Sequence, residues 1–301
     1  MYVSSVNGDK VYRISTNGTV TAFATINLLP EGLAFGTNGL LFVANDGGNW
    51  INRVTTSGTA SVFVTNVAQP YGLAFDSKGN LYAASQSSLL GRIRKITPQG
   101  AVTNFGPTIN APYGMAIDAG DNIYVSSAYS YIYKITPDGG SSMFRFVNGA
   151  TGLAFDRAGN LYVADTSGTI TRITPAGVAS TFATGLGSSL VGLAFDNDGN
   201  LYAASYTSGA ISKIAPDRTV TTFATVPGGP SFIAVFPPPK FDPGPISLAR
   251  FGNDLVVSWF GNFILQSAAD SAGPFSDIVG ATSPYTNVVS SADAAFFRLR
   301  N

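Results

Sequence analysis

The chain contains no cysteine and no histidine, and Glu31 is its single glutamate among 301 residues. The absence of cysteine excludes disulfide bonds, thiolate nucleophiles and metal sites built on cysteine. The absence of histidine excludes Ser-His-Asp triads, imidazole general bases and zinc sites with histidine ligands. Acid–base chemistry in this protein would therefore have to rest on its few carboxylates.

Charge is also scarce. Only 11% of the residues are charged, and the 17 basic and 17 acidic residues cancel. With no basic run, we expect no nucleic-acid partner. No stretch of 18 apolar residues occurs, so we expect no membrane insertion. No signal peptide precedes Met1, so we expect either a mature chain or a protein that stays inside the cell. The low Lys and Glu content, with abundant Ser, Thr, Asn and Gly, nevertheless favours an extracellular or cell-surface protein.

A short motif recurs about every 40 residues through the first three quarters of the chain, which is typical of a radial or solenoid array. Its glycine stands at Gly32, Gly72, Gly114, Gly152 and Gly192. A degenerate sixth copy begins at Ser231 and has no glycine at the corresponding place.

Each copy holds four short apolar runs bounded by Gly, Pro, Asn and Asp, which predicts four β-strands and hence one propeller blade. Residues 1–5 align with the second strand of a blade, and residues 231–236 supply the missing first strand. The predicted fold class is therefore all-β: a six-bladed β-propeller over residues 1–236, closed by pairing of its N- and C-terminal strands. The alternative is a fragment whose first strand lies upstream.

Beyond residue 236 the repeat ends. The proline-rich residues 237–245 predict a stiff linker. Segments of residues 246–301 then predict a small β-sandwich with Trp259 in its core, and without a disulfide it should be only marginally stable by itself. The predicted strands are 246–260, 262–267, 275–279 and 295–300. This region resembles the short C-terminal β-modules of many secreted bacterial proteins, which implies a role in anchoring, sorting or spacing.

The repeat pattern GLAFDxxGNLYVADxxxxxIxRITPxG resembles the NHL-repeat propellers and their relatives, the gluconolactonase (SMP-30-type) and virginiamycin B lyase propellers. The resemblance covers residues 1–236. For the lactonase type it implies a divalent metal at the channel mouth, held by a Glu, one or two Asn and an Asp, several of them directly before an inner-strand glycine. Only Glu31 matches here. For the lyase type it implies a catalytic histidine, which this chain lacks.

One carboxylate is too few for a calcium ion, which takes six to eight oxygen ligands. We therefore expect no cofactor. A weakly bound Ca²⁺ or another divalent metal near Glu31 is the alternative.

The turns of the repeat fall into two sets. The links between the first and second strands, and between the third and fourth, are nearly constant and predict tight hairpins. The links between the second and third strands, and between blades, differ in every copy. In an up-and-down blade the two sets lie on opposite faces. Recognition is therefore expected on the variable face, where loops stand on a rigid scaffold.

Aromatic and acidic side chains collect on this variable face, a composition that suits sugars or extended polymers. The candidate ligand-binding residues are Glu31, Asn45, Asp46, Trp50, Tyr71, Tyr113, Tyr129, Asp165 and Tyr206. Alternatively, the aromatic side chains pack on neighbouring loops and plug the channel. Glu31 and Asp165 form the best carboxylate pair for weak metal binding or acid–base work, and they are the only catalytic candidates.

Two further rings repeat once per blade. The first follows the second strand and is expected to meet water near the channel mouth: Ser5, Asn45, Ser85, Ser127, Asp165 and Ser205. The second is a basic residue in the third strand, and such a regular position predicts a role in blade architecture rather than an anion site. Its members are Arg13, Arg53, Lys95, Lys134, Arg172 and Lys213.

These patterns together predict a non-catalytic secreted or surface binding protein, expected to be a monomer, whose variable face recognises a carbohydrate, a peptide or another polymer, including a protein ligand. One alternative is a degenerate metal-dependent lactonase-like hydrolase that uses Glu31. The other is a structural scaffold whose aromatic face contacts another protein.

Overall fold

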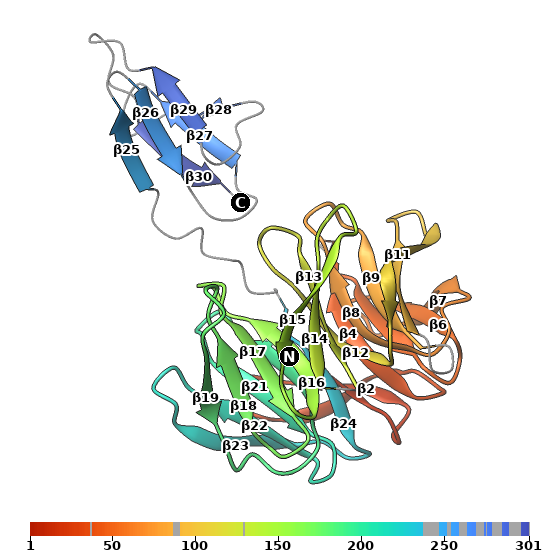
Figure 1. The fold of residues 1–301 in the computed structure, drawn as a ribbon. Coiled ribbons are helices and arrows are strands. Elements are labelled where there is room, and N and C mark those ends of the chain that lie inside the picture. Colours follow the sequence, from red (N-terminus) through yellow and green to blue (C-terminus); the bar gives the residue numbers. More distant parts are fainter. Residues whose placement is uncertain are drawn as a thin grey trace. The chain divides into compact units, whose positions relative to one another are not determined.

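The computed structural model describes residues 1–36, 38–86, 91–128, 130–236, 247–251, 254–258, 264–268, 274, 276–278, 285–288 and 296–300. The chain divides into two compact units, Met1–Pro239 and Lys240–Asn301. Strands and turns make up the described parts of both units (Figure 1). None of the described residues lies in a helix, so none of them forms a helix long and apolar enough to cross a membrane.

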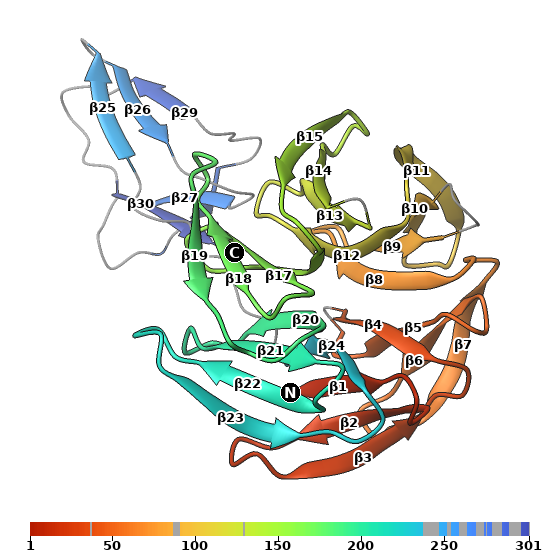
Figure 2. The ribbon, with the colours of Figure 1, turned by 60° about the horizontal axis from the view of Figure 1, so that its bottom comes forward.

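The first unit is a six-bladed β-propeller of six four-stranded antiparallel sheets arranged around a centre (Figure 2). From the innermost strand outward, blade 1 is β24 (Pro230–Ala234), β1 (Tyr2–Ser5), β2 (Lys10–Ile14) and β3 (Val20–Thr25), and blade 2 is β4 (Pro30–Phe35), β5 (Leu41–Asn45), β6 (Trp50–Val54) and β7 (Ala60–Thr65). In the same order, blade 3 is β8 (Pro70–Phe75), β9 (Leu81–Ser85), β10 (Gly91–Ile96) and β11 (Val102–Ile109), and blade 4 is β12 (Pro112–Ile117), β13 (Ile123–Ser127), β14 (Tyr131–Ile135) and β15 (Ser141–Phe146). Blade 5 is β16 (Ala150–Phe155), β17 (Leu161–Asp165), β18 (Ile170–Ile173) and β19 (Ala179–Ala183), and blade 6 is β20 (Leu190–Phe195), β21 (Leu201–Ser205), β22 (Ala210–Ile214) and β23 (Val220–Thr225).

Blade 1 is composite, and it closes the ring. Its inner strand β24 comes from the far end of the propeller sequence and pairs antiparallel with β1, with Val3 opposite Ile233. The predicted six blades and the predicted closure are therefore confirmed.

Every inner strand carries a β-bulge at the same place. In blade 2, Pro30 lies opposite Asn45 and Leu33 opposite Val43, so Glu31 and Gly32 together face the single residue Ala44. The same irregularity occurs in the other five blades. A bulge bends its strand and re-aims a side chain, and here it does so at the centre of the ring.

Five of the six bulges contain a glycine, and the neighbouring blade requires it. A Cβ atom built on Gly32 would lie 2.0 Å from the carbonyl oxygen of Tyr71, and one on Gly152 would lie 2.1 Å from that of Val191. The corresponding contacts at Gly72, Gly114 and Gly192 are 2.5, 2.2 and 2.3 Å. Glycine therefore recurs in the motif because adjacent inner strands approach so closely that a Cβ atom would not fit.

The turns between the first two strands of a blade are fixed by an aspartate, as predicted. The carboxylate of Asp156 accepts hydrogen bonds from the backbone N–H and the side-chain amide of Asn160, and from the hydroxyl group of Tyr162. Asp76 and Asp196 bind their own turns in the same way. These oxygens are engaged in turn structure.

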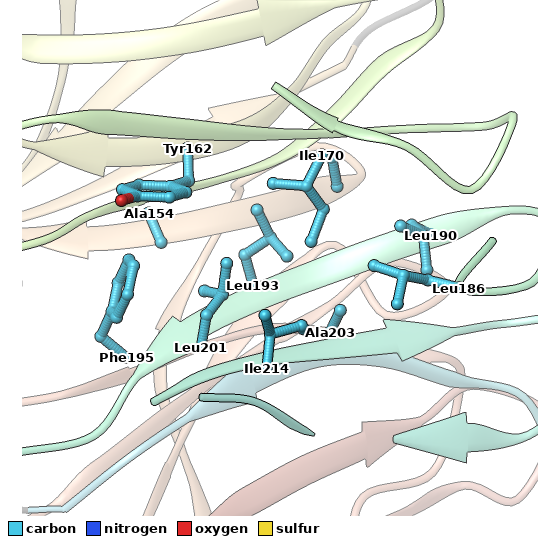
Figure 3. Packing of buried hydrophobic residues seen from close by; sticks show 11 residues of the cluster. Ala154, Tyr162, Ile170, Leu186, Leu190, Leu193, Phe195, Leu201, Ala203 and Ile214 are labelled. Atoms are coloured by element: carbon cyan, nitrogen blue, oxygen red, sulfur yellow. The ribbon is translucent and has the colours of Figure 1, made fainter. Parts of the chain in front are cut away.

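The core lies between blades. Between blades 5 and 6, Leu193, Leu201 and Ile214 pack with Tyr162 and Ile170 (Figure 3). Equivalent clusters fill the other junctions.

The basic ring belongs to this architecture. Lys134 and Lys213 stand opposite Tyr124 and Tyr202 on the adjacent strand, with each ammonium group over the aromatic ring at 5.5 and 6.0 Å from its centre. A cation over an aromatic face is a stabilising contact. The predicted structural role of this ring is therefore supported.

The second unit contains two three-stranded antiparallel sheets, β25-β26-β29 and β28-β27-β30. Their strands are β25 (Ser247–Phe251), β26 (Asp254–Ser258), β27 (Ile264–Ala268), β28 (Ser276–Asp277), β29 (Tyr285–Val288) and β30 (Phe296–Arg300). The predicted segment 246–260 proves to be a hairpin of two strands, and β29 was not predicted. Trp259 lies outside the described residues.

Candidate functional site

The first residue of each bulge forms a ring around the centre of the propeller. Going round from blade 1, its members are Ser231, Glu31, Tyr71, Tyr113, Thr151 and Val191. Glycine follows five of the six members, whereas the members themselves vary between blades, with only tyrosine occurring twice. The fold thus places six side chains of five kinds at equivalent central positions, and four of them form the cluster described next.

Glu31 is buried and hydrogen-bonded across the seam between blades 1 and 2. Only 7% of its surface is exposed, and its Oε2 accepts a hydrogen bond from the hydroxyl group of Ser231. Burial raises the pKa of Glu31 from 4.5 to about 7, the Ser231 hydrogen bond opposes this rise, and the nearby carboxylate of Asp46 adds to it. Glu31 therefore changes its protonation state near neutral pH, as a general acid or base requires.

Tyr71 and Tyr113 extend the cluster into blades 3 and 4. Their ring centres are 5.0 Å apart. The Tyr71 hydroxyl group lies close enough to the Asp46 carboxylate to lower the pKa of Asp46, and Ser231 lies close enough to Tyr113 to lower the pKa of Tyr113. Burial, with Asp46 and Glu31 nearby, raises the pKa of Tyr71 to about 12, so both tyrosines are hydroxyl donors at neutral pH.

Asp46 is the member of this group that has a side-chain oxygen without a hydrogen-bond donor. Its pKa is raised by burial, against the opposing effect of the nearby Tyr71 hydroxyl group, and its Oδ1 atom is buried without a hydrogen-bond partner. A buried carboxylate oxygen without a donor costs free energy. The groups that shift the pKa values of Glu31, Asp46, Tyr71 and Tyr113 include no Lys or Arg in the described chain. We call Glu31, Asp46, Tyr71, Tyr113 and Ser231 the channel-mouth cluster.

Phe232 fills the centre beneath the cluster. It occupies the bulge position that is glycine in the other five blades. Its ring centre lies 5.7 Å from that of Tyr113, which comes from blade 4, directly across the ring from blade 1. Leu33, Val191 and Tyr113 join Phe232 in one apolar cluster. Side chains from opposite blades therefore meet at the axis and form an apolar floor.

Other predicted site residues are engaged inside their own loops. Asn45, 1% exposed, donates from its side-chain amide to the Asn27 carbonyl and to Asn52, and its Oδ1 accepts from the N–H of Gly48. Trp50 donates from Nε1 to the same Asn52 side chain at 3.0 Å. These contacts brace the loop that carries Asp46.

Asp165 caps a turn. Its Oδ1 accepts hydrogen bonds from the N–H and hydroxyl groups of Ser167 and from the N–H of Thr169. It ends the second strand of blade 5, whereas Glu31 lies in blade 2, across the ring. No interaction found in the described chain joins the two, so the structure does not assemble the predicted carboxylate pair.

Tyr206 lies at the rim, where it is 37% exposed and accepts a hydrogen bond from the side chain of Asn7. It contributes to raising the pKa of Tyr113, which places it near the cluster. Tyr129 lies outside the described residues.

The ring after the second strand does not meet water, contrary to expectation. Its members are 9% exposed or less. The hydroxyl groups of Ser5, Ser85 and Ser205 donate to the carbonyl oxygens of Pro227, Ala68 and Ser188, each in the link that enters the same blade. These side chains fix the entry of the inner strand, and so they position the channel-mouth residues.

Two residues of the centre were not predicted from the sequence. Ser231 is the hydrogen-bond donor to Glu31, and Phe232 forms the apolar floor. The signal was present, because the sixth copy of the motif has Phe232 where the other five have glycine, and Ser231 stands at the position that varies between copies. For a metal, no group of three or more His, Cys, Asp or Glu side chains that could hold an ion occurs in the residues the structure describes.

The propeller is similar to lyase and lactonase structures. The chain is 19% identical to the virginiamycin B lyase of Staphylococcus aureus, over 82% of this chain and 83% of that chain, with a TM-score of 0.55. It is 17% identical to a gluconolactonase of Xanthomonas campestris, over 85% and 88% of the two chains, with a TM-score of 0.62. A streptogramin B lyase structure is 16% identical over 90% and 93%, with a TM-score of 0.56.

No protein-family model and no curated protein matches the sequence. At these identities, the similarity establishes a common propeller fold.

Proposed function

We propose that the protein binds a small, neutral, hydroxyl-rich molecule, such as a sugar ring, at the channel-mouth cluster. The observation that carries the proposal is the buried, unpartnered Oδ1 of Asp46 beside the Tyr71 hydroxyl group. A ligand hydroxyl group would give this oxygen the donor it lacks. The rings of Tyr71 and Tyr113 offer apolar surface for the face of a sugar.

Charge favours a neutral ligand over an anionic one. The cluster contains two carboxyl groups, those of Glu31 and Asp46. The described groups that shift their pKa values include no Lys or Arg. A phosphate or carboxylate ligand would meet like charge in a partly buried site, where the repulsion is poorly screened.

The test is a binding titration with methyl glycosides of common hexoses at millimolar concentrations, followed by NMR or calorimetry. We expect one or more to bind, and Asp46→Asn to weaken that binding at least tenfold, as expected when a hydrogen bond to a charged group is lost. Asp198→Asn, an exposed aspartate outside the cluster, is the matched control and should bind like the wild type. Absence of binding to every glycoside, or equal binding by Asp46→Asn, would reject the proposal.

A second candidate is metal-independent opening of a cyclic ester. It is favoured by the Glu31 pKa of about 7 and by the lactonase and lyase names of similar structures. In hydrolysis, the Glu31 carboxylate would take a proton from the water that attacks the ester carbonyl, and return it to the ring oxygen as the C–O bond breaks. Gluconolactone and a cyclic depsipeptide are the trial substrates. Turnover in EDTA that is lost in Glu31→Gln would support this activity, and turnover that survives in that variant would reject the role of Glu31.

A further inference from the structure

Two links between blades have the same backbone and very different side chains. The link 227–230 enters blade 1 and reads Pro-Gly-Gly-Pro, whereas the link 27–30 enters blade 2 and reads Asn-Leu-Leu-Pro. The two central residues have φ values of +79° and +74° in the first link and +71° and +62° in the second.

The hydrogen bonds confirm that the links are equivalent. In blade 1, the carbonyl groups of Gly228 and Gly229 accept from the N–H groups of Asn7 and Val6, at 2.8 and 3.2 Å. In blade 2, the carbonyl groups of Leu28 and Leu29 accept from those of Gly47 and Asp46, both at 3.1 Å.

A left-handed backbone suits glycine and is unfavourable for leucine. The other four links also place residues in this conformation, and none of these is a large apolar residue: Asn66, Gln69, Ala111, Gly149, Gly185, Gly187 and Ser189. Leu28 and Leu29 are thus two adjacent strained residues where the fold elsewhere tolerates small or polar ones.

Packing does not account for these leucines. Leu28 is 49% exposed and Leu29 is 38% exposed, so roughly half of each side chain gains nothing from burial. Exposed apolar side chains on strained backbone indicate a role other than stability.

The two leucines adjoin the channel-mouth cluster. Leu29 binds the backbone of Asp46, whose side chain carries the unpartnered oxygen. Two residues after Leu29 the chain reaches Glu31. The two leucines therefore pair with the loop that carries Asp46 and lie close in sequence to Glu31.

We propose that Leu28 and Leu29 form an apolar shelf for a hydrocarbon substituent of the ligand bound at the channel-mouth cluster. This rests on the proposed function and narrows it: the ligand is amphiphilic, with a hydroxyl-rich head at Asp46 and Tyr71 and an alkyl or aryl group on the shelf. A purely polar sugar polymer would leave the shelf uncovered.

The test compares methyl and hexyl β-D-glucoside, which share a head group and differ in the chain, below the concentration at which the hexyl compound forms micelles. We expect the hexyl compound to bind the wild type about tenfold more tightly, as burial of about two methylene groups gives. In the double variant Leu28→Asn/Leu29→Asn this gain should disappear while methyl glucoside binding stays unchanged. Asparagine tolerates a left-handed backbone, so the melting temperature should remain within a few degrees of the wild type or rise.

Val62→Asn is the matched control, since Val62 is a 50% exposed apolar residue on the outer strand of the same blade; it should keep the hexyl gain. A gain that survives in the double variant would overturn the shelf and leave the proposed function standing. A large fall in melting temperature would show that the leucines serve packing, and would also overturn it. If neither glucoside binds the wild type, the shelf and glucose as the head group both fail, and the methyl glycoside panel then decides the proposed function separately.

Discussion

At the scale of single residues, the sixth copy of the repeat carries most of the individuality of the centre. Five copies place glycine in the bulge, and the sixth places Phe232 there, preceded by Ser231. Ser231 binds Glu31, and Phe232 contacts Tyr113 from the opposite side of the ring. A repeat protein thus becomes asymmetric at its axis through the copy that matches the motif least.

The raised pKa of Glu31 predicts a pH-dependent effect on stability. Between pH 4.5 and about 7 the folded protein holds a proton that the unfolded chain has lost, so the buried carboxyl group destabilises the fold increasingly as the pH rises through this range. A rise from 4.5 to about 7 corresponds to an upper limit of about 3 kcal/mol. Glu31→Gln should therefore have little effect below pH 4.5 and stabilise most above pH 7, as measured by urea unfolding at pH 4.5 and pH 8.

Asp198→Asn, at an exposed turn, provides the control for a change of one carboxyl group. An equal effect of Glu31→Gln at the two pH values would show that Glu31 does not titrate between them.

At the scale of strands, the fold depends on the close approach of neighbouring inner strands. Sequence spacing alone was enough to predict the blades, because the glycine of the bulge and the aspartate of the first hairpin are both dictated locally and recur with the period. The bulge itself was not predicted, since two residues facing one leave no distinct pattern in the sequence. The burial of Ser85 and Ser205 was not predicted either, because a small polar side chain can hydrogen-bond equally well to water and to a buried carbonyl oxygen.

Gly152→Ala tests the inter-strand contact. The new methyl group would lie 2.1 Å from the carbonyl oxygen of Val191, so adjacent inner strands must move apart, at a cost of about 1–3 kcal/mol or more. Gly120→Ala is the control, because its Cβ atom would approach only the side-chain ends of Asn122 and Asp118, at 3.1 and 3.3 Å. We expect Gly120→Ala to change the free energy of unfolding by less than about 0.5 kcal/mol. Equal losses in the two variants would contradict the packing argument.

At the scale of the whole molecule, the sequence predicted a closed ring because residues 1–5 matched a second strand and residues 231–236 matched the first strand of the same blade. The candidate site was predicted only in part. Glu31, Asp46, Tyr71 and Tyr113 do come together, whereas Asn45, Trp50 and Asp165 are engaged in their own loops. The difference lies in side-chain direction at the strand ends, which the position in the repeat does not specify.

The closure predicts opposite outcomes for two truncations. A chain that ends at Pro239, the last residue of the first unit, should unfold in a single transition near that of the propeller in the full chain. A chain that ends at Gly229 lacks β24, and with it the buried Phe232, Ile233 and Ala234. Its melting temperature should fall by roughly 10 °C or more, or the chain should aggregate through the open edge of β1. Similar melting curves for the two chains would contradict closure by β24.

The composite blade also sets the order in which the protein becomes competent during its synthesis. The ribosome makes β24 after every other strand of the ring. Glu31 is therefore translated about 200 residues before Ser231, the partner that holds it. A nascent chain that has completed five blades still lacks Phe232 at the centre and the Ser231 hydroxyl group that donates a hydrogen bond to Glu31. Its central site is therefore incomplete. Under the proposed function, ligand binding would therefore begin only after β24 has paired with β1 and closed the ring.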